Sequence, residues 1–430
     1  MRTIEVQAID EEIMNKLSLK SRYAFINTNL MAIIDDKAKN FMNKVQRFCI
    51  KMDKKVDHMK DDIYNWIPEF GEEGLITRSQ QFPELDLGWN GPDGYYGLTA
   101  DLIRAIAIDQ FNPQFNMGMG ATVLAINPLQ HHHEGMDHRI NAIKEMVTGK
   151  AVGCILITEP KVGSDAVRPL TKCVAQPDGS YLITGEKIYN TNAPKSKYAV
   201  FYATTEPGKS ETVMQGYFDD LQNTPGITIK RVGIPWVPKL YLGQEIFNNA
   251  VCKKENVLAP PGKGRDHMFE GLNLERMGIA ILDCAEMWTA VTHATIYANM
   301  RQQMGQIILL HQGVGFTLTE LWAKTVEYTL SCLKFCEIYD NALIKYNGKI
   351  PPQLDQQLIP VAHALKYRGA ILAERICYES ANLMGGAGVN DNTLMHDLLG
   401  VSRIQEIIGG TRQIQQYVMS MSLRKFFKTI

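Results

Sequence analysis

The spacing of apolar residues changes twice along this chain of 430 residues. From residue 1 to about 150, apolar residues recur at three- and four-residue steps, which is typical of helices. From 151 to about 262 they alternate with polar residues, which indicates strands. From residue 263 the helical spacing returns and holds to the end. The sequence therefore predicts a helical block, a small all-β unit and a second helical block that forms a bundle.

Individual segments support this division. Residues 35–62 predict a charged, lysine-rich helix with one apolar face, and helical spacing also runs from Leu98 to Val147. In the middle block, Tyr181–Thr184 and the aromatic run at 198–203 predict strands. A helical stripe near the end of the chain stops at Gly385-Gly386, as a helix C-cap would.

Charge and composition narrow the class of protein. Lys and Arg total 45 and Asp and Glu total 46, which gives a net charge of −1 and lacks the basic excess of most nucleic-acid binders. No apolar run approaches the roughly 18 residues that a membrane span needs. The start, MRTIEVQAIDEEIMNKL, has acids where a signal peptide is apolar and does not resemble a transit peptide. We therefore expect a globular protein of a bacterial-type cytoplasm.

The cysteines and a histidine run predict no metal site. Eight cysteines are scattered without a CxxC pair, which is typical of reduced core thiols. Cys332 and Cys336 are one helical turn apart, but no second pair has matching spacing, so core packing is the better interpretation. His131, His132 and His133 are consecutive and cannot converge on one ion, so we expect a surface turn there.

Several strings carry the chemistry. ITEPKVGSD at 157–165 is followed by GEKIYNTNA at 185–193, and the last third contains GLNLERMGIA at 271–280, RQQMGQ at 301–306 with Gln312 downstream, and MGGAG at 384–388 followed by IIGGTRQIQ at 407–415. As a set and in this order, these strings resemble the acyl-CoA dehydrogenase family. The resemblance covers roughly residues 35 to 425.

The resemblance implies a fold and an assembly. Family members have an N-terminal α-helical domain, a middle β-barrel or sandwich domain and a C-terminal four-helix bundle, in a multi-domain α+β chain. We expect these domains at 25–150, 151–262 and 263–430, after an N-terminal extension at 1–24 that has no family counterpart. Relatives are homotetramers that hold FAD at subunit junctions and pass electrons to an electron-transfer flavoprotein, and we expect the same here.

The resemblance also assigns residues to the cofactor. Thr158 and the segment Tyr189-Asn190-Thr191 are expected to hold the flavin ring, because hydroxyls can donate to and accept from its edge. Relatives usually have Trp in place of Tyr189. Arg301 and Gln312 are expected to reach the FAD of a neighbouring subunit, Arg301 by neutralising pyrophosphate. The remaining residues expected to contact FAD are Ser164, Gly385, Gly386, Thr411 and Gln413.

The catalytic base is the most informative position. The family reaction needs a carboxylate of raised pKa in an apolar pocket, and many members carry it immediately before the Gly-Thr of the last string. Here that residue is Gly409. A smaller branch, which includes isovaleryl-CoA and long-chain enzymes, takes its glutamate from an earlier helix, where this chain has Glu275. We therefore predict Glu275 as the base; the alternatives are a helix glutamate paired with Arg276, or a degenerate site.

Other residues are expected to bind the thioester. By resemblance, the backbone N–H of Gly409 polarises the thioester carbonyl together with a ribityl hydroxyl of FAD, and such donors are worth about 3–4 kcal/mol each in comparable sites. Ser164, Asn273, Arg276 and Gly410 are the expected substrate contacts. Asn273 stands where relatives carry Asp, and Gly400-Val401 where they carry Arg-Asp, so the chain belongs to a divergent subgroup.

The sequence thus predicts FAD-dependent α,β-dehydrogenation of an acyl-CoA to the 2-enoyl-CoA. Two alternatives stay open. The first is an enzyme that runs the same chemistry backward as an enoyl-CoA reductase, or one that oxidises cyclic or aromatic acyl-CoAs in bacterial degradation. The second is a catalytically silent protein that only binds CoA esters. The acyl group, the direction of reaction and the electron acceptor are not specified by the sequence.

Overall fold

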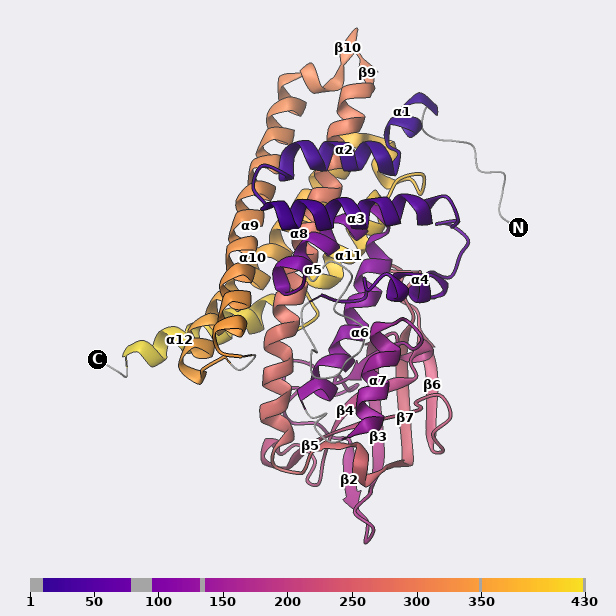
Figure 1. Ribbon diagram of the computed structural model, residues 1–430, viewed down its shortest axis with the longest axis vertical. Coiled ribbons are helices and arrows are strands. Elements are labelled where there is room, and N and C mark those ends of the chain that lie inside the picture. The colour runs from indigo at the N-terminus through magenta and orange to yellow at the C-terminus, as the bar shows by residue number, and fades with distance from the viewer. Residues whose placement is uncertain (1–10, 79–94, 132–135, 348–349, 428–430) are drawn as a thin grey trace.

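The computed structural model describes residues 11–78, 95–131, 136–347 and 350–427. In these residues the chain forms helices, then a sheet, then helices, in the predicted order (Figure 1). The sheet lies at one end of the molecule, and the long helix α8 runs from it toward a small hairpin at the opposite end.

The first block is helical. Its α-helices are α1 (Glu11–Lys16), α2 (Leu19–Leu30), α3 (Asp36–Asp53), α4 (Ile67–Glu72), α5 (Leu98–Phe111), α6 (Pro113–His131) and α7 (Asp137–Val147). The predicted boundary at residue 24 falls inside α2, whose Tyr23, Ile26 and Leu30 are buried in the same core as residues of α8. The histidine run continues past α6 into residues 132–135, which lie outside the described residues.

Helix α3 is shorter than the predicted helix at 35–62. It begins after Asp35, whose side chain caps the helix by accepting from the Ala38 N–H at 2.7 Å, and it ends at Asp53. Beyond it, the Asp57 carboxylate accepts from the backbone N–H groups of Met59 and Lys60 at 3.0 and 3.2 Å. Such local bonds compete with helical ones, which accounts for the early end of the helix.

The middle block is one mixed sheet. Its strands are β1 (Gly153–Leu156), β2 (Lys172–Ala175), β3 (Tyr181–Thr191), β4 (Tyr198–Thr204), β5 (Val213–Phe218), β6 (Ile227–Val232), β7 (Leu242–Cys252) and β8 (Val257–Ala259). The order across the sheet is β6-β7-β3-β2-β4-β5-β8, and β1 pairs with β4 in parallel. The two long antiparallel partners β3 and β7 carry two register shifts, at Ile183/Gly185 and Ile188/Asn190.

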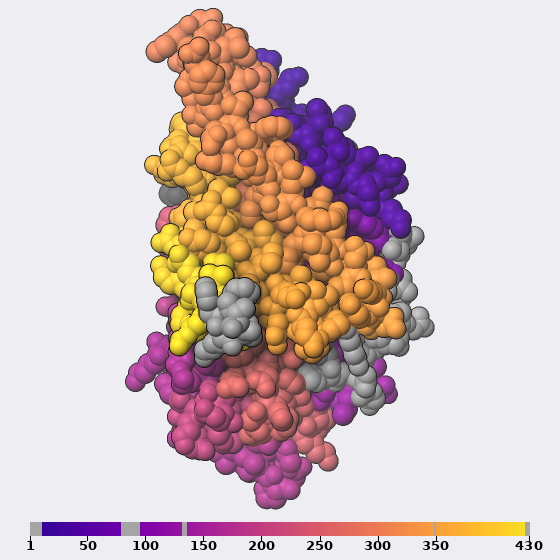
Figure 2. All heavy atoms as spheres, turned by 90° about the vertical axis from the view of Figure 1, so that its left-hand side faces the viewer, coloured from indigo at the N-terminus to yellow at the C-terminus, as the bar shows by residue number. Residues whose placement is uncertain are grey.

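The last block is a bundle of long helices. It contains α8 (Gly264–Met300), the hairpin β9 (Gln302–Gln303) and β10 (Gln306–Ile307), α9 (Gln312–Lys345), α10 (Pro352–Met384), α11 (Met395–Gln405) and α12 (Arg412–Phe427). Figure 2 shows α9 and the C-terminal helices covering one face of the molecule. Cys332 and Cys336 are fully buried in α9, which confirms their assignment to the core. No described helix is both long and apolar enough to span a membrane.

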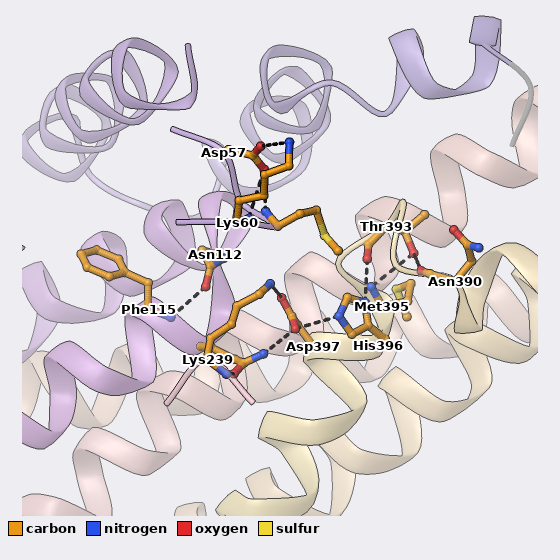
Figure 3. A network of polar contacts seen from close by, with 12 residues as sticks. Asp57, Lys60, Asn112, Phe115, Lys239, Asn390, Thr393, Met395, His396 and Asp397 are labelled. Carbon is orange, nitrogen blue, oxygen red and sulfur yellow. Dashed lines mark hydrogen bonds and ion pairs between the residues drawn. The ribbon is translucent and has the colours of Figure 1, made fainter. Parts of the chain in front are cut away.

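Helix α11 is fastened to the segment that precedes β7. The buried Asp397 carboxylate pairs with the Lys239 ammonium at 2.8 Å and contacts the His396 ring at 3.0 Å (Figure 3). One turn later, a Cβ atom added at Gly400 would overlap the carbonyl oxygen of Trp236. The backbone of that segment therefore occupies the space that a side chain at residue 400 would need, which accounts for the glycine where relatives carry Arg.

Candidate active site

The start of α8 brings Glu275 to the turn at Gly409, although 134 positions separate the two residues in the chain. A Cβ atom added at Gly409 would lie 3.6 Å from both Cδ and Oε1 of Glu275. The carboxylate on α8 therefore reaches the place where a side chain at residue 409 would begin. The same Cβ would lie 2.5 Å from Cδ1 of Ile279, so Ile279 occupies part of that space.

The surroundings of Glu275 raise the pKa of its carboxyl group. Its side chain keeps some contact with solvent, but protein atoms enclose the carboxylate. This desolvation raises the pKa of Glu275 to about 7, against the smaller opposing effect of the positive charges on Arg276 and Lys366. A carboxyl group with a pKa near the working pH can accept a proton and release it again, which suits a general base.

Arg276 is committed to contacts inside the chain. Its guanidinium donates to Oδ1 of Asn273 at 2.8 Å and to the carbonyl of Gly409 at 3.3 Å. It also lies 3.2 Å from Nε2 of His363, and burial together with the Arg276 charge lowers the pKa of His363 to about 4. The neutral imidazole can then accept from Arg276. Two of the four predicted substrate contacts, Asn273 and Arg276, thus bind each other, and Arg276 also binds the 409 turn.

The turn at Gly409-Gly410 is held by residues that the sequence analysis did not single out. Both glycines have positive φ, 61° and 93°, a region that favours glycine. The Lys366 ammonium donates to the Gly410 carbonyl at 2.8 Å, and the Gln415 amide donates to the same carbonyl at 2.7 Å and to that of Gly409 at 3.0 Å. The only feature of the sequence that could have indicated Lys366 is its position next to Leu365 in an apolar helical stripe.

Thr411 and Gln413, two further predicted residues of the string at 407–415, follow the same turn. Helix α12 begins at Arg412, so Thr411 is the residue directly before the helix, and Gln413 is exposed in its first turn. Gly385 ends α10 with φ 59°, and a Cβ atom at Gly385 or Gly386 would meet no atom within 4 Å. The conformation explains Gly385 as a helix cap, and the space beside both glycines is open.

A second group of predicted residues meets at the C-terminal end of the interior strand β3, a region called the sheet edge below. The Ile188 N–H donates to the Thr158 carbonyl at 2.9 Å, which places Thr158 beside β3 next to Tyr189. Tyr189 sits in the register shift between Ile188 and Asn190, has φ 64° and is 56% exposed. Within the described chain, the hydroxyls of Thr158 and Thr191 make no side-chain hydrogen bond. The edge therefore presents two hydroxyls and an aromatic ring to a ligand.

A buried ion pair supports this edge from inside. The ammonium of Lys187 lies 2.8 Å from the carboxylate of Glu159, and both side chains are almost fully buried. Glu159 also accepts from the backbone N–H groups of Leu170 and Thr171 at 2.7 and 3.1 Å. The Glu of the first string and the Lys of the second thus join the two segments, which was not predicted.

Asn190 and Ser164, the other predicted residues of these two segments, differ in their surroundings. The Asn190 amide faces inward and donates to the carboxylate of Glu245. Burial raises the pKa of Glu245 to about 8. Ser164 is exposed on the turn after β1. Ser164 is thus open to a ligand, whereas the side chain of Asn190 is used within the domain.

Arg301 and Gln312 lie at the far end of the molecule from this edge. They flank the β9–β10 hairpin, beyond the end of α8 (Figure 1), and both are exposed. The 26 residues between Glu275 and Arg301 follow α8, which corresponds to roughly 39 Å at 1.5 Å per residue. One copy of the chain therefore does not bring Arg301 or Gln312 to Thr158. Met304 in the hairpin is 94% exposed, and Leu310 and Phe316 nearby are exposed as well.

A narrow crevice lies against Glu275, and the space that protein atoms enclose in it is about 10 Å³, roughly that of one water molecule. Helix α6, the segment from β1 to Ile157, strand β4 and the first turns of α8 each contribute to its walls. The lining residues are Leu124, Asn127, Ile155, Ile157, Tyr202, Met268, Gly271, Leu272 and Glu275. The candidate base therefore faces a small, mostly apolar space between the helical blocks and the sheet.

Comparisons with known proteins identify the family of the chain. The family model for the acyl-CoA dehydrogenase middle domain matches residues 154–236, and that for the acyl-CoA dehydrogenase C-terminal domain matches residues 262–423. The chain belongs to the acyl-CoA dehydrogenase family. Members of this family are flavoprotein oxidoreductases, so the chain is assigned to that class of enzyme.

Individual relatives are distant but cover most of the chain. An acyl-CoA dehydrogenase of Bacillus subtilis is 25% identical over 369 residues, which is 84% of this chain and 89% of the relative. Mitochondrial isovaleryl-CoA dehydrogenase of Arabidopsis thaliana is 23% identical over 421 residues, 94% and 95% of the two chains. The solved structure of butyryl-CoA dehydrogenase from Megasphaera elsdenii has a TM-score of 0.79 at 21% identity and covers 91% of this chain and 98% of its own. The acyl-CoA dehydrogenase fold is therefore confirmed.

Proposed function

We propose that this member of the family catalyses the α,β-dehydrogenation of an acyl-CoA thioester, with Glu275 as the base. The observation that carries the proposal is the 3.6 Å between the Glu275 carboxylate and the Cβ position of residue 409. The resemblance implies that family members with glutamate at that turn direct it to the same space. Glu275 thus places a carboxylate from α8 in the space beside residue 409, and the side chain of Ile279 occupies another part of that space.

The residues of this chain divide the chemistry between them. Glu275, ionised above its pKa of about 7, takes the proton from the carbon next to the thioester carbonyl. The backbone N–H of Gly409, fixed by the bonds of Lys366 and Gln415 to the turn, polarises that carbonyl. Arg276 transfers no proton in this scheme and holds the 409 turn against the start of α8.

The sheet edge fits a flavin. FAD, when bound, accepts the hydride from the β carbon. The Thr158 and Thr191 hydroxyls and the exposed ring of Tyr189 supply the donors, acceptors and aromatic surface that an isoalloxazine needs. Ser164, Gly385, Gly386, Thr411 and Gln413 are proposed as further contacts. The side chain of Asn190 acts from behind, through its bond to Glu245.

Assembly is part of the same proposal. Arg301 and Gln312 are exposed beside the hairpin that carries the exposed Met304, and they lie far from Thr158 in their own chain. We infer a homotetramer in which they contact the FAD of another copy, and an electron-transfer flavoprotein as the acceptor of the electrons. Size-exclusion chromatography with light scattering tests the tetramer.

The dehydrogenation is tested by anaerobic bleaching of the flavin. The protein is loaded with FAD and mixed with a panel of acyl-CoAs, and the absorbance of oxidised flavin is followed. We expect rapid bleaching by at least one saturated thioester and a rate about 10²- to 10⁴-fold lower for Glu275→Gln. Glu270→Gln, an exposed glutamate on the same helix, is the matched control and should bleach like the wild type.

Three results would contradict the proposal. The protein could bind no flavin, Glu275→Gln could bleach at the wild-type rate, or thioesters could shift the flavin spectrum without bleaching it. The last result indicates a silent binder. Reoxidation of reduced flavin by enoyl-CoAs, with poor bleaching by saturated ones, indicates a reductase instead.

A further inference from the structure

Two buried carboxyl groups share one buried cation behind the sheet edge. Lys187 on β3 and Glu245 on β7 are partners across the two strands, and both residues are fully buried. The Lys187 ammonium already binds the Glu159 carboxylate at 2.8 Å. One positive charge cannot neutralise two carboxylates, so full ionisation of this group would leave an uncompensated negative charge away from water.

The two carboxyl groups differ in their partners. Burial alone would raise the pKa of Glu159, but the charge of Lys187 and bonds from two backbone N–H groups outweigh burial and lower this pKa. The Glu245 carboxyl accepts from the Asn190 amide through Oε2, and Oε1 has no hydrogen-bond partner among the described residues. Burial raises the pKa of Glu245 to about 8, against the smaller effects of Asn190 and Lys187. The proton of this group therefore resides on Glu245.

The other groups around Glu245 supply no second positive charge. Its strand partner on β6 is the apolar Ile229, and the methyl group of Ala193 also lies beside it. On β1, burial and, to a lesser degree, the charge of Glu245 raise the pKa of the Cys154 thiol, which therefore stays neutral. Within the described chain, Lys187 is the one cation whose charge acts on Glu245. The protonation of Glu245 is thus decided by burial and by a lysine that another carboxylate already engages.

The Glu245 carboxyl points to the end of β3 that carries the proposed flavin contacts. A Cβ atom added at Gly243 would lie 2.0 Å from Oε1 of Glu245, so the carboxyl fills the space beside the Gly243 backbone. Gly243 is the strand partner of Asn190, whose amide donates to the other carboxyl oxygen. Asn190 lies between Tyr189 and Thr191 in the chain. One side chain therefore links the proton-bearing carboxyl to the segment proposed to hold the flavin ring.

A ring bound over this end of β3 makes the ionisation of Glu245 harder. Tyr189 is 56% exposed, so a ligand that covers it removes water from the end of the strand. Removal of nearby water disfavours the charged form of a buried carboxyl group. By linkage, the neutral form of Glu245 then binds the ligand more tightly than the ionised form does.

We propose that Glu245 is a positioning residue for the cofactor. In its neutral form it holds residues 189–191 through Asn190 and favours the binding of FAD, and in its ionised form it weakens that binding. The inference rests on the proposed function, because it takes the sheet edge as the site of the flavin. It adds a pH-dependent control of cofactor retention that lies in the sheet and is separate from the candidate base Glu275.

Release of FAD on dilution tests the proposal without any thioester. The FAD-loaded protein is diluted in buffers of equal ionic strength at pH 7 and pH 9, and the fluorescence of released flavin gives the dissociation constant. Because one proton with a pKa of about 8 is involved, we expect the dissociation constant to rise about 10-fold between these pH values. Circular dichroism of the same samples checks that the chain stays folded.

Variants connect the pH dependence to this carboxyl group. Glu245→Gln cannot ionise and keeps an acceptor for Asn190, so its dissociation constant should resemble that of the wild type at pH 7 and change less than about twofold up to pH 9. Glu186→Gln is the matched control and should keep the 10-fold rise. Glu186 precedes Lys187 on β3, so its side chain points to the opposite face of the sheet, where it binds the Gln244 amide.

A second variant tests the link through Asn190. Glu245→Met also removes the titratable group, but it removes the acceptor for the Asn190 amide as well. It should therefore bind FAD about 3- to 10-fold more weakly than Glu245→Gln at pH 7 and show equally little pH dependence. Either variant provides the pH test if the other does not fold.

The outcomes separate the two proposals. A wild-type dissociation constant that is the same at pH 7 and pH 9, or a rise of equal size in the variants of Glu245, overturns the role of Glu245 and leaves the dehydrogenase proposal standing. Equal affinities of Glu245→Gln and Glu245→Met at pH 7 overturn positioning through Asn190. If the wild-type protein binds no FAD at either pH, the proposed function itself fails.

Discussion

The helical wall around Glu275, formed by the start of α8 and the turn at Gly409-Gly410, differs from the sheet edge around Tyr189. The difference is in which groups hydrogen-bond to the polar atoms of each region. At the wall, the carbonyls of Gly409 and Gly410 are held by Arg276, Lys366 and Gln415, all from the same chain. At the edge, Tyr189 faces solvent in a left-handed conformation, and its strand is supported by β7 and, from inside, by the pair of Lys187 with Glu159.

This difference indicates which part of the site exists before any ligand binds. The wall positions and desolvates the candidate base through folding alone. The edge leaves hydroxyls and an aromatic ring open, so its order depends on what binds there. Changes at the wall should therefore alter chemistry and pH dependence, whereas changes at the edge should alter cofactor retention.

The largest effect is expected from moving the carboxylate back to the turn. The double variant Glu275→Gln with Gly409→Glu should stay about 10²- to 10⁴-fold slower than the wild type in flavin bleaching, because Cδ1 of Ile279 lies 2.5 Å from the Cβ position of residue 409. Adding Ile279→Ala removes the obstruction and should restore about 10-fold of the rate. A double variant as fast as the wild type would show that the wall is not preorganised as described.

The next largest effect is on stability, at the support of the sheet edge. Lys187→Met leaves the carboxylate of Glu159 buried without its cation, which should lower the free energy of unfolding by about 3–5 kcal/mol. Urea denaturation measures this. Lys209→Met removes an exposed pair with Glu206 and serves as the control with no measurable change. Similar midpoints for the two variants would argue against a buried pair behind the edge.

The pH dependence of stability distinguishes the wall from an exposed helix surface. Because the pKa of Glu275 is raised from 4.5 to about 7, the folded state holds the proton more tightly, and its stabilising contribution is complete below pH 4.5 and lost as the pH rises through 7. Glu275→Gln should thus stabilise the protein by about 1–3 kcal/mol at pH 8 and hardly at pH 4.5. Thermal denaturation at both pH values, with Glu270→Gln as the control, measures it; equal effects of the two variants would place Glu275 in bulk solvent.

The smallest effect is expected at the edge itself. Tyr189→Gly removes a side chain at φ 64°, so the free energy of unfolding should rise by at most about 1 kcal/mol. The retained FAD should fall after gel filtration, because the ring surface is lost. Lys172→Gly, at an exposed strand position of β2, should instead cost about 0.5–1 kcal/mol and keep FAD. Unchanged FAD retention in Tyr189→Gly would remove that residue from the cofactor site.

The fold could be predicted in order but not in detail. Apolar spacing located the helical blocks and the strands because burial on one face imposes the period. It did not locate the end of α3 at Asp53, because the bonds of the Asp57 carboxylate to nearby N–H groups lie outside any periodic pattern. The glycine at residue 400 was visible as a departure, but only its approach to the Trp236 backbone explains it.

The part of the site that could be predicted consists of residues that lie in the sequence motifs. The strings indicated Thr158, Tyr189 and Glu275, and the structure brings Thr158 beside Tyr189 and Glu275 to the 409 turn. Lys366 and Gln415 were missed because they act through main-chain carbonyls, whose positions no spacing reveals.

The sequence by itself determined the family, the order of the three blocks and the absence of a carboxylate at Gly409, because these depend on residue type and spacing along the chain. Only the tertiary structure decided that the carboxylate of Glu275 reaches the same space, that its pKa rises, and that a narrow crevice lies against it. Desolvation and hydrogen-bond satisfaction depend on every atom around a group, and those atoms come from segments far apart in the chain.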